Sequence, residues 1–242
     1  MRSTRSLSTE EWLEARQEHL KKEKEFTRLR DEVSRHRRDM PWVKLDKEYI
    51  FDTERGKQSL ANLFEDCSQL ITYHFMFYPD WAQGCKSCLF LADSYAGSAA
   101  HLKARNVSLV KVSKASLDQI NTLKMRMGWD FPWVSSGPSD FNQDFHVSFT
   151  EEELENASAY YNYRKMGFPE VEAPGISVFF KDDDGTVYHT YSSYGHGLDM
   201  FITTYHLLDI VAKDRDEQDL PYSMAWIRHH DKYNDPNDSG SL

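Results

Sequence analysis

Two of the three cysteines in the chain, Cys85 and Cys88, are spaced C-x-x-C within the stretch DWAQGCKSCLFLAD. Two thiols at this spacing can exchange electrons with a substrate by forming and breaking a disulfide, and they can also supply half of a zinc site. A third interpretation is a pair of unreactive cysteines in a packed domain. The surrounding sequence has to decide among redox chemistry, metal binding and a purely structural role.

Zinc is the least favoured of the three. A structural zinc ion requires four ligands, and the chain has no second C-x-x-C. Cys67 has no evident partner, and His74 and His101 stand at positions more typical of packed or surface residues. The cluster at residues 229–231, two histidines and an aspartate, is interpreted as solvated. We therefore expect neither a metal ion nor an organic cofactor.

Redox chemistry requires one cysteine to ionise easily, because the thiolate is the attacking species. The N-terminus of a helix stabilises a thiolate, and Cys85 is predicted to stand where a helix begins, beside the cation of Lys86. Cys88 lies one turn further into that helix. We expect Cys85 to attack a disulfide or dithiol substrate and Cys88 to resolve the mixed disulfide that forms on Cys85.

The segments around the pair alternate between strand and helix patterns. Residues 70–77 are nearly continuous in apolar side chains, which is typical of a strand buried on both faces. A helical period follows over residues 88–103, a second strand over residues 107–112, and a second helix over residues 116–127 that ends at Gly128. Because a helix joins the two strands, we expect the strands to be parallel.

The C-terminal half is predicted to contain an insertion and then a hairpin. Residues 129–173 are irregular and are interpreted as the insertion. Residues 176–180 and 186–191 flank an Asp-Gly turn, which indicates a β-hairpin, and residues 198–211 follow as an amphipathic helix. This order predicts an α/β protein with a thioredoxin-like three-layer fold, in which helices cover both faces of a mixed central sheet.

The N-terminal segment, residues 1–40, is strongly charged. We predict one helix over residues 8–39, ended by Pro41, whose apolar positions are too sparse for an independent core. It is expected to pack against the main domain or against a second subunit, which would make the protein a homodimer. Residues 41–235 are predicted to form the thioredoxin-like domain, and residues 236–242 a frayed tail.

Composition excludes several classes of function. The net charge of −10 argues against a general nucleic-acid surface, which requires a basic face. Only the N-terminal segment is basic, with 11 Lys and Arg against 9 Asp and Glu. No apolar run approaches the ~20 residues of a membrane span, and the N-terminus lacks the apolar core of a secretory signal. We expect a cytoplasmic protein, in which structural disulfides are rare.

Four further residues are predicted to contribute to substrate binding. In thioredoxin-like proteins a cis proline before the first hairpin strand faces the active cysteines, so we expect the bond before Pro174 to be cis; the alternative is an ordinary trans proline. Trp81 is interpreted either as part of the mouth of the site or as core packing. Gly84 and Lys86 flank Cys85 and complete the set.

The chain resembles an uncharacterised thioredoxin-like family, a domain of unknown function whose members are described as predicted dithiol-disulfide oxidoreductases. Five stretches between about residue 20 and about residue 233 carry the resemblance: KEKEFTRLRDEVSRHRRDMPWV, YHFMFYPDWAQGCKSC, RMGWDFPWVSSGPSDFNQDF, PGISVFFKDDDGTVYHTYSSYG and AWIRHHDKY. The resemblance places the thiol pair on Cys85 and Cys88. Lys86 stands where the family is expected to have proline, a position that tunes the redox potential of the pair.

Comparison with thioredoxin itself shows a second difference. The buried strand at residues 70–77 holds no acidic residue, so the carboxylate that assists proton transfer in thioredoxin is absent. We take His74 or a loop residue as the candidate replacement.

Two other functions stay open. A strand over residues 48–51, a turn, a short helix over residues 59–64 and the buried strand resemble the layout of peroxiredoxins. The peroxidatic motif of that family, P-x-x-x-[TS]-x-x-C, fits neither cysteine: its threonine position falls on Ala82 when counted from Cys85 and on Cys85 itself when counted from Cys88. A thiol peroxidase is therefore the second candidate, and a non-catalytic interaction protein on the same fold, suggested by the N-terminal helix, is the third.

Overall fold

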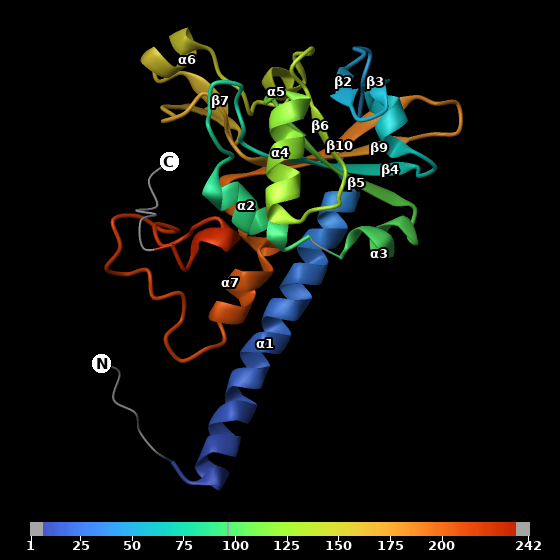
Figure 1. Ribbon diagram of the computed structural model, residues 1–242. Coiled ribbons are helices and arrows are strands. Elements are labelled where there is room, and N and C mark those ends of the chain that lie inside the picture. The colour runs from blue at the N-terminus through green and yellow to red at the C-terminus, as the bar shows by residue number, and fades with distance from the viewer. Residues whose placement is uncertain (1–6, 96, 236–242) are drawn as a thin grey trace. The chain divides into compact units, whose positions relative to one another are not determined.

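The computed structural model describes residues 7–95 and 97–235 (Figure 1). The chain divides between Pro41 and Trp42 into two compact units. The first contains helix α1 (Thr9–Arg38), which begins with a capping box: the Ser8 hydroxyl accepts from the Glu11 N–H, and the Glu11 carboxylate accepts from the Ser8 N–H. The predicted N-terminal helix is confirmed, and none of its residues is buried.

The second unit is built on an eight-stranded mixed sheet, with strand order β1-β10-β9-β4-β5-β6-β2-β3 among the described residues. The strands are β1 (Val43–Lys44), β2 (Ile50–Thr53), β3 (Gly56–Ser59), β4 (Gln69–His74), β5 (Val107–Ser113), β6 (Trp133–Ser135), β9 (Gly175–Lys181) and β10 (Val187–Tyr194). A separate hairpin pairs β7 (Ala159–Tyr161) with β8 (Arg164–Met166).

Short helices connect these strands. The α-helices are α2 (Lys86–Asp93), α3 (Ala99–Lys103), α4 (Leu117–Met127), α5 (Phe141–Asp144), α6 (Glu151–Glu155) and α7 (Thr203–Leu208). The 3₁₀ helices are η1 (Leu60–Phe64), η2 (Gly195–Phe201) and η3 (His230–Lys232). Within the described part of the chain, no helix has both the length and the apolar character that crossing a bilayer requires.

Four adjacent strands give the thioredoxin-like arrangement. Strand β4 runs parallel to β5 and antiparallel to β9, and β9 runs antiparallel to β10. The parallel pair is connected through α2 and α3, and the antiparallel pair by a turn at Gly185, whose φ of +88° is a conformation that glycine adopts without strain. The predicted thioredoxin-like fold with a mixed sheet and the predicted hairpin are both confirmed.

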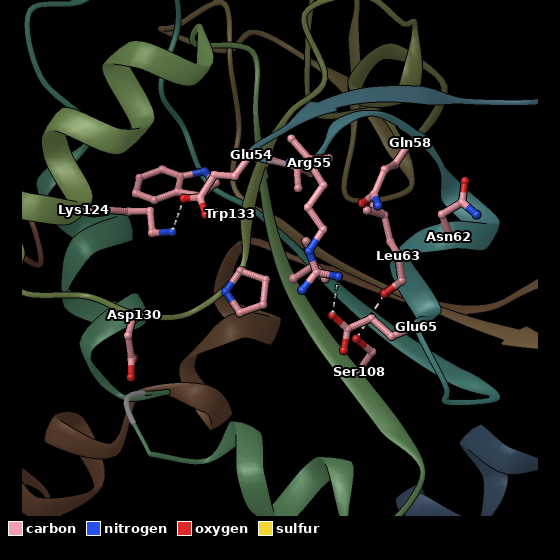
Figure 2. Close-up of a pocket in the computed structure, with 14 residues that line it drawn as sticks. Glu54, Arg55, Gln58, Asn62, Leu63, Glu65, Ser108, Lys124, Asp130 and Trp133 are labelled. Carbon is pink, nitrogen blue, oxygen red and sulfur yellow. Dashed lines mark hydrogen bonds and ion pairs between the residues drawn. The ribbon is translucent and has the colours of Figure 1, made fainter.

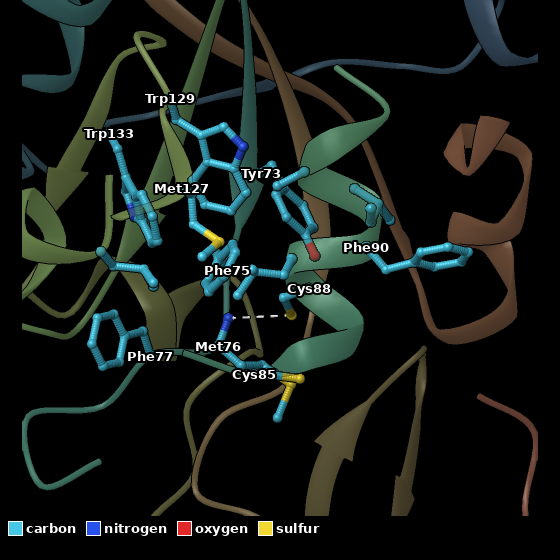
Figure 3. Packing of buried hydrophobic residues seen from close by; sticks show 14 of the residues in the cluster. Tyr73, Phe75, Met76, Phe77, Cys85, Cys88, Phe90, Met127, Trp129 and Trp133 are labelled. Carbon is cyan, nitrogen blue, oxygen red and sulfur yellow. Dashed lines mark hydrogen bonds between the residues drawn. The ribbon is translucent and has the colours of Figure 1, made fainter. Parts of the chain in front are cut away.

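The sheet is covered on both faces, which makes three layers. Because side chains alternate along a strand, Ile71 and Tyr73 of β4 point to one face, while Leu70 and His74 point to the other. Helices α2 and α4 lie over the first face (Figure 1), and the larger cluster of buried side chains there includes both cysteines (Figure 3). Helices η1 and α5 cover the second face, where Phe64 and Phe141 are fully buried.

Two predicted helices are each divided in the structure. The helix expected over residues 88–103 is two helices, α2 and α3, because the chain turns between them and Gly97 takes a φ of +85°. The helix expected over residues 198–211 is likewise the 3₁₀ helix η2 followed by α7. The periodicity of apolar residues continues across both breaks, which is why the sequence pattern did not reveal them.

The predicted insertion, residues 129–173, is partly a component of the sheet. Its first strand, β6, pairs in parallel with β5, and Trp133 lies opposite Lys111. Helix α5 contributes Phe141 to the core of the second face. The remainder forms a small cluster of its own around Val147 and Tyr161, so only this part is an addition to the central fold.

Candidate functional site

Cys85 lies at the junction between the loop that follows β4 and the start of α2. It is the N-cap residue of α2: its carbonyl accepts from the Leu89 N–H at 3.0 Å, and its own N–H donates to the Met76 carbonyl at 3.0 Å. The predicted start of a helix at the first cysteine is confirmed. Cys85 is buried, with 7% of its surface exposed.

The environment of Cys85 favours its thiolate. A hydrogen bond from the Cys88 thiol is the largest cause that lowers the pKa of Cys85 below its ordinary value, and burial opposes it. The N–H groups of Cys88 and Ser87 at the start of α2 and the charge of Lys86 lower the pKa further. Cys85 is therefore the cysteine that ionises first.

Cys88 has the opposite character. It is 1% exposed, and burial is the largest cause that raises its pKa well above the ordinary value, with the neighbouring Cys85 as the second. Its sulfur accepts a hydrogen bond from the Met76 N–H at 3.5 Å (Figure 3). Interaction with the Tyr73 hydroxyl lowers the pKa of Cys88 in part. Cys88 is thus a buried thiol with two groups placed to stabilise its anion.

Tyr73, and not His74, is the polar group of β4 that reaches the cysteines. His74 points to the other face, where its Nε2 lies 2.9 Å from the Ser177 hydroxyl and its ring stacks on Phe141 with centroids 5.3 Å apart. The suggestion that His74 replaces the carboxylate of thioredoxin is therefore wrong. Alternation along β4 could have found Tyr73, because residues 71, 73 and 75 share one face.

A cavity of about 500 Å³ opens beside Cys85. It is lined by Met76, Trp81, Ala82, Gln83, Cys85, Lys86, Ser87, Glu170 and Tyr222. Trp81 and Lys86, two of the predicted substrate-binding residues, therefore line the same cavity as Cys85. Sequence reasoning missed Glu170 and Tyr222, because they come from segments far along the chain that carry no motif.

The other two predicted binding residues do not line this cavity. Gly84 is packed inward, since a Cβ atom there would lie 2.7 Å from Phe75 Cε1 and 3.0 Å from Leu123 Cδ2. Pro174 accepts a hydrogen bond from the Tyr161 hydroxyl at 2.7 Å through its carbonyl. The expectation of a cis bond before Pro174 is wrong: no described residue has a cis peptide bond, and trans is the intrinsically favoured form.

The cluster at residues 229–231 is part of the site's support and not a solvated tail. His229 is buried, its Nε2 lies 3.0 Å from the Gly84 carbonyl, and its Nδ1 contacts the Arg126 guanidinium. His230 pairs with Asp93 of α2 at 3.0 Å. The C-terminal segment thereby anchors the residue that precedes Cys85 and the far end of the helix that carries Cys88.

Substitution of Gly84 by alanine is expected to destabilise the fold by roughly 1–3 kcal/mol, because the added methyl group overpacks against Phe75 and Leu123. Urea denaturation measures the change. The matched control is Gly167→Ala, where the new Cβ would meet Ala157 Cβ at an ordinary 3.5 Å. Equal stability of the two variants would contradict the packing role assigned to Gly84.

A second pocket, of about 240 Å³, lies away from the thiols between the β2–β3 hairpin, β5 and α4. Four of its five charged side chains are paired with one another: Lys124 with Glu54 at 3.0 Å, and Arg55 with Glu65 at 3.9 Å (Figure 2). Its lining contains no cysteine or histidine. It therefore offers no thiol for redox chemistry, and the cavity beside Cys85 is the better candidate for a reaction site.

Several solved structures are similar to this chain. A peroxidoxin, BcpB, from Mycobacterium tuberculosis is 16% identical, covering 69% of this chain and 96% of that chain, with a TM-score of 0.42. A peroxiredoxin Q from Xanthomonas campestris is 15% identical, covering 64% and 87%, with a TM-score of 0.40. The mitochondrial 2-Cys peroxiredoxin of Plasmodium falciparum is 12% identical, covering 68% and 94%, with a TM-score of 0.39.

The fold assignment rests on the strand topology, not on these similarities. No curated protein matches the chain. A family model does: it is described as "Bacterial protein of unknown function (DUF899)" and matches residues 1–233. This span includes the thiol pair, the cavity residues and the C-terminal segment that anchors Gly84. The protein belongs to the DUF899 family.

Proposed function

We propose that the protein is a dithiol–disulfide oxidoreductase that exchanges disulfides through Cys85 and Cys88. The observation that carries the proposal is the contrast between the two thiols at the start of α2. Cys85 borders a cavity and has its pKa lowered, while Cys88 is buried with its pKa raised. Two-step exchange requires this arrangement: one thiol ionises easily and attacks, and a second thiol beside it, which ionises only at higher pH, resolves the mixed disulfide.

The reaction would run in two displacements. The Cys85 thiolate attacks one sulfur of a substrate disulfide, the second substrate sulfur leaves as a thiolate and takes up a proton, and a mixed disulfide remains on Cys85. Cys88 then loses its proton and attacks the Cys85 sulfur, which releases the remaining substrate thiol. The substrate gains two electrons and the cysteine pair loses them; a dithiol substrate would be oxidised by the reverse sequence.

Tyr73 and Met76 would act in the second displacement. The buried Cys88 thiol must become an anion there, and burial opposes this. The Met76 N–H bonds to its sulfur and the Tyr73 hydroxyl lowers its pKa, so both would stabilise the negative charge as it forms. No metal or organic cofactor enters this scheme, and we retain the predicted cytoplasmic location, in which reduced thiols are the resting form.

The test is mass spectrometry of the protein equilibrated in glutathione buffers between about −300 and −120 mV, the range of cytosolic and oxidising couples. We expect an intramolecular disulfide between Cys85 and Cys88 within that range. A Cys67→Ser variant serves as control, because Cys67 is buried and takes no part in the scheme. Absence of the Cys85–Cys88 disulfide at every potential would refute the proposal.

Replacement of Cys88 by serine is expected to trap the intermediate. The serine hydroxyl cannot resolve the mixed disulfide, so the substrate thiol should stay attached to Cys85 and be detected as an added mass on its peptide. The Cys67→Ser variant should show no such adduct. If only the reverse variant, Cys85→Ser, accumulates an adduct, then the order of attack is the opposite of the one proposed.

The exposed apolar residues of α1 support a second proposal, that this helix mediates self-association. Phe26 is 66% exposed and Leu29 is 58% exposed in the unit that contains them. We expect the double substitution Phe26→Asp and Leu29→Asp to lower the mass measured by light scattering, because buried carboxylates would oppose association. If the native protein already has the mass of one chain, the proposal fails.

A further inference from the structure

Cys85 is accessible only to a narrow class of reactants. The residue is 7% exposed, and it forms part of the wall of the cavity of about 500 Å³. Cavities of about 300–1,000 Å³ are the size that proteins use for small molecules. A disulfide in a folded protein would have to bring its sulfur to a thiol that lies below the surface, whereas a small disulfide can enter the cavity.

The walls of the cavity come from three distant parts of the chain. Met76, Trp81 and Ala82 belong to the loop between β4 and α2, while Glu170 comes from the segment before β9 and Tyr222 from the C-terminal segment. The segments that carry Glu170 and Tyr222 enclose Cys85, which the loop between β4 and α2 alone would not surround. Pro174, which would align an extended substrate chain, does not line the cavity.

The chemistry of the walls is mainly apolar. Met76, Ala82 and the rings of Trp81 and Tyr222 provide apolar and aromatic surface. The charged lining residues are one cation and one carboxylate, Lys86 and Glu170, and the Lys86 amine lies 3.4 Å from the Tyr222 hydroxyl. With one charge of each sign, the lining gives a highly charged molecule no net attraction.

We propose that the substrate is an uncharged, apolar or aromatic disulfide of low molecular weight, bound with its apolar group against Trp81 and Tyr222. This inference rests on the proposed function, since it names the substrate class of the same site. One sulfur of the bound disulfide would lie at Cys85 and accept its attack. The two electrons come from the cysteine pair, and the two released thiols take up the protons, as in the exchange scheme above.

The test compares three disulfides in single-turnover reactions with the reduced protein. They are 2,2′-dithiodipyridine, which is aromatic and uncharged; bis(2-hydroxyethyl) disulfide, which is small and polar; and oxidised glutathione, which carries several charges. Each rate is divided by the rate of a free model thiol with the same disulfide, which removes differences in leaving group. We expect the normalised rate with dithiodipyridine to exceed that with oxidised glutathione by at least about tenfold.

Variants of the walls test the binding mode. Trp81→Ala and Tyr222→Ala should each lower the normalised rate with dithiodipyridine severalfold and change that with bis(2-hydroxyethyl) disulfide little. Tyr222→Phe keeps the ring and should therefore lose less of this rate than Tyr222→Ala. Tyr222 is 57% exposed, so its removal should leave the fold intact. Trp12→Ala, a tryptophan in the first unit, is the matched control and should change neither rate.

The outcomes separate the two proposals. If no reagent converts Cys85 and Cys88 to a disulfide, the proposed oxidoreductase function fails. If all three reagents do so with equal normalised rates, or if the glutathione rate is the highest, the function stands and the proposed substrate class fails. If Trp81→Ala and Tyr222→Ala lower the normalised rate equally with all three reagents, the proposed binding mode is also overturned.

Discussion

Replacement of Cys85 by serine is expected to abolish disulfide exchange, lowering its rate by roughly a thousandfold or more. A serine hydroxyl is not an effective nucleophile toward sulfur, and Cys88 cannot take its place because it is buried and its pKa is raised. The rate is measured by the release of thiol from a small aromatic disulfide. The unfolding transition of the variant should remain close to that of the native protein, since serine is only slightly smaller.

The pH dependence of the native protein provides a second readout of the same residue. Because the hydrogen bond from Cys88 lowers the pKa of Cys85, the thiolate fraction reaches its maximum at a lower pH than for a free thiol. The exchange rate should therefore rise with pH and level off earlier than for a model thiol. A profile that coincides with the model thiol, or substantial activity in Cys85→Ser, would contradict the assignment of Cys85 as nucleophile.

Replacement of Lys111 by methionine is expected to stabilise the protein by a few kcal/mol near neutral pH. Lys111 is fully buried in β5, and its amine has no hydrogen-bond partner among the described residues. The amine lies 3.2 Å from the centre of the Phe131 ring and 5.4 Å from that of Tyr95. Methionine would fill a similar volume without a charge to desolvate, and such replacements are often stabilising.

The size of the stabilisation depends on pH. Burial lowers the pKa of Lys111 from its ordinary 10.5 to about 7. Between these values the unfolded chain binds a proton that the folded chain does not, so native stability rises with pH across that window. Below about pH 7 the buried amine is charged, so the full free-energy cost of burying its charge is present. The gain in the free energy of unfolding from Lys111→Met should therefore be greatest at pH 6 and should shrink toward pH 10.

Urea unfolding at pH 6, 8 and 10 measures this difference. Lys165→Met is the control, because Lys165 is an exposed residue of β8, and its replacement should change stability little at any of these pH values. A Lys111→Met variant that is less stable than the native protein at pH 6 would show that the charged amine contributes favourable contacts with Phe131. An advantage that is independent of pH would show that the gain comes from packing alone.

Much of the fold could be predicted from local patterns. The apolar runs of β4 and β5, the period of α4 with Gly128 at its end, and the Asp-Gly turn of the hairpin are signals that short stretches of chain carry by themselves. They are sufficient for the thioredoxin-like topology and for placing Cys85 at a helix start. The break between α2 and α3 was missed, because the apolar period continues past Gly97.

Only part of the candidate site could be predicted from the sequence. Trp81 and Lys86 are neighbours of the cysteines in sequence and could be proposed from proximity. Glu170 and Tyr222 reach the cavity through tertiary packing, which no local pattern encodes. The burial of Lys111 could not be predicted either. In a strand buried on both faces, such as β5, the sequence does not show that a lysine is enclosed with its neighbours.

One residue of the β4–α2 loop bonds to both cysteines through its backbone. The Met76 carbonyl accepts from the Cys85 N–H, and the Met76 N–H donates to the Cys88 sulfur. When Cys88 loses its proton or joins a disulfide, the acceptor of that N–H changes while the rest of the loop stays tied to Cys85. The amide resonance of Met76 should therefore act as an intrinsic reporter, whose chemical shift distinguishes the reduced, mixed-disulfide and oxidised forms without any added probe.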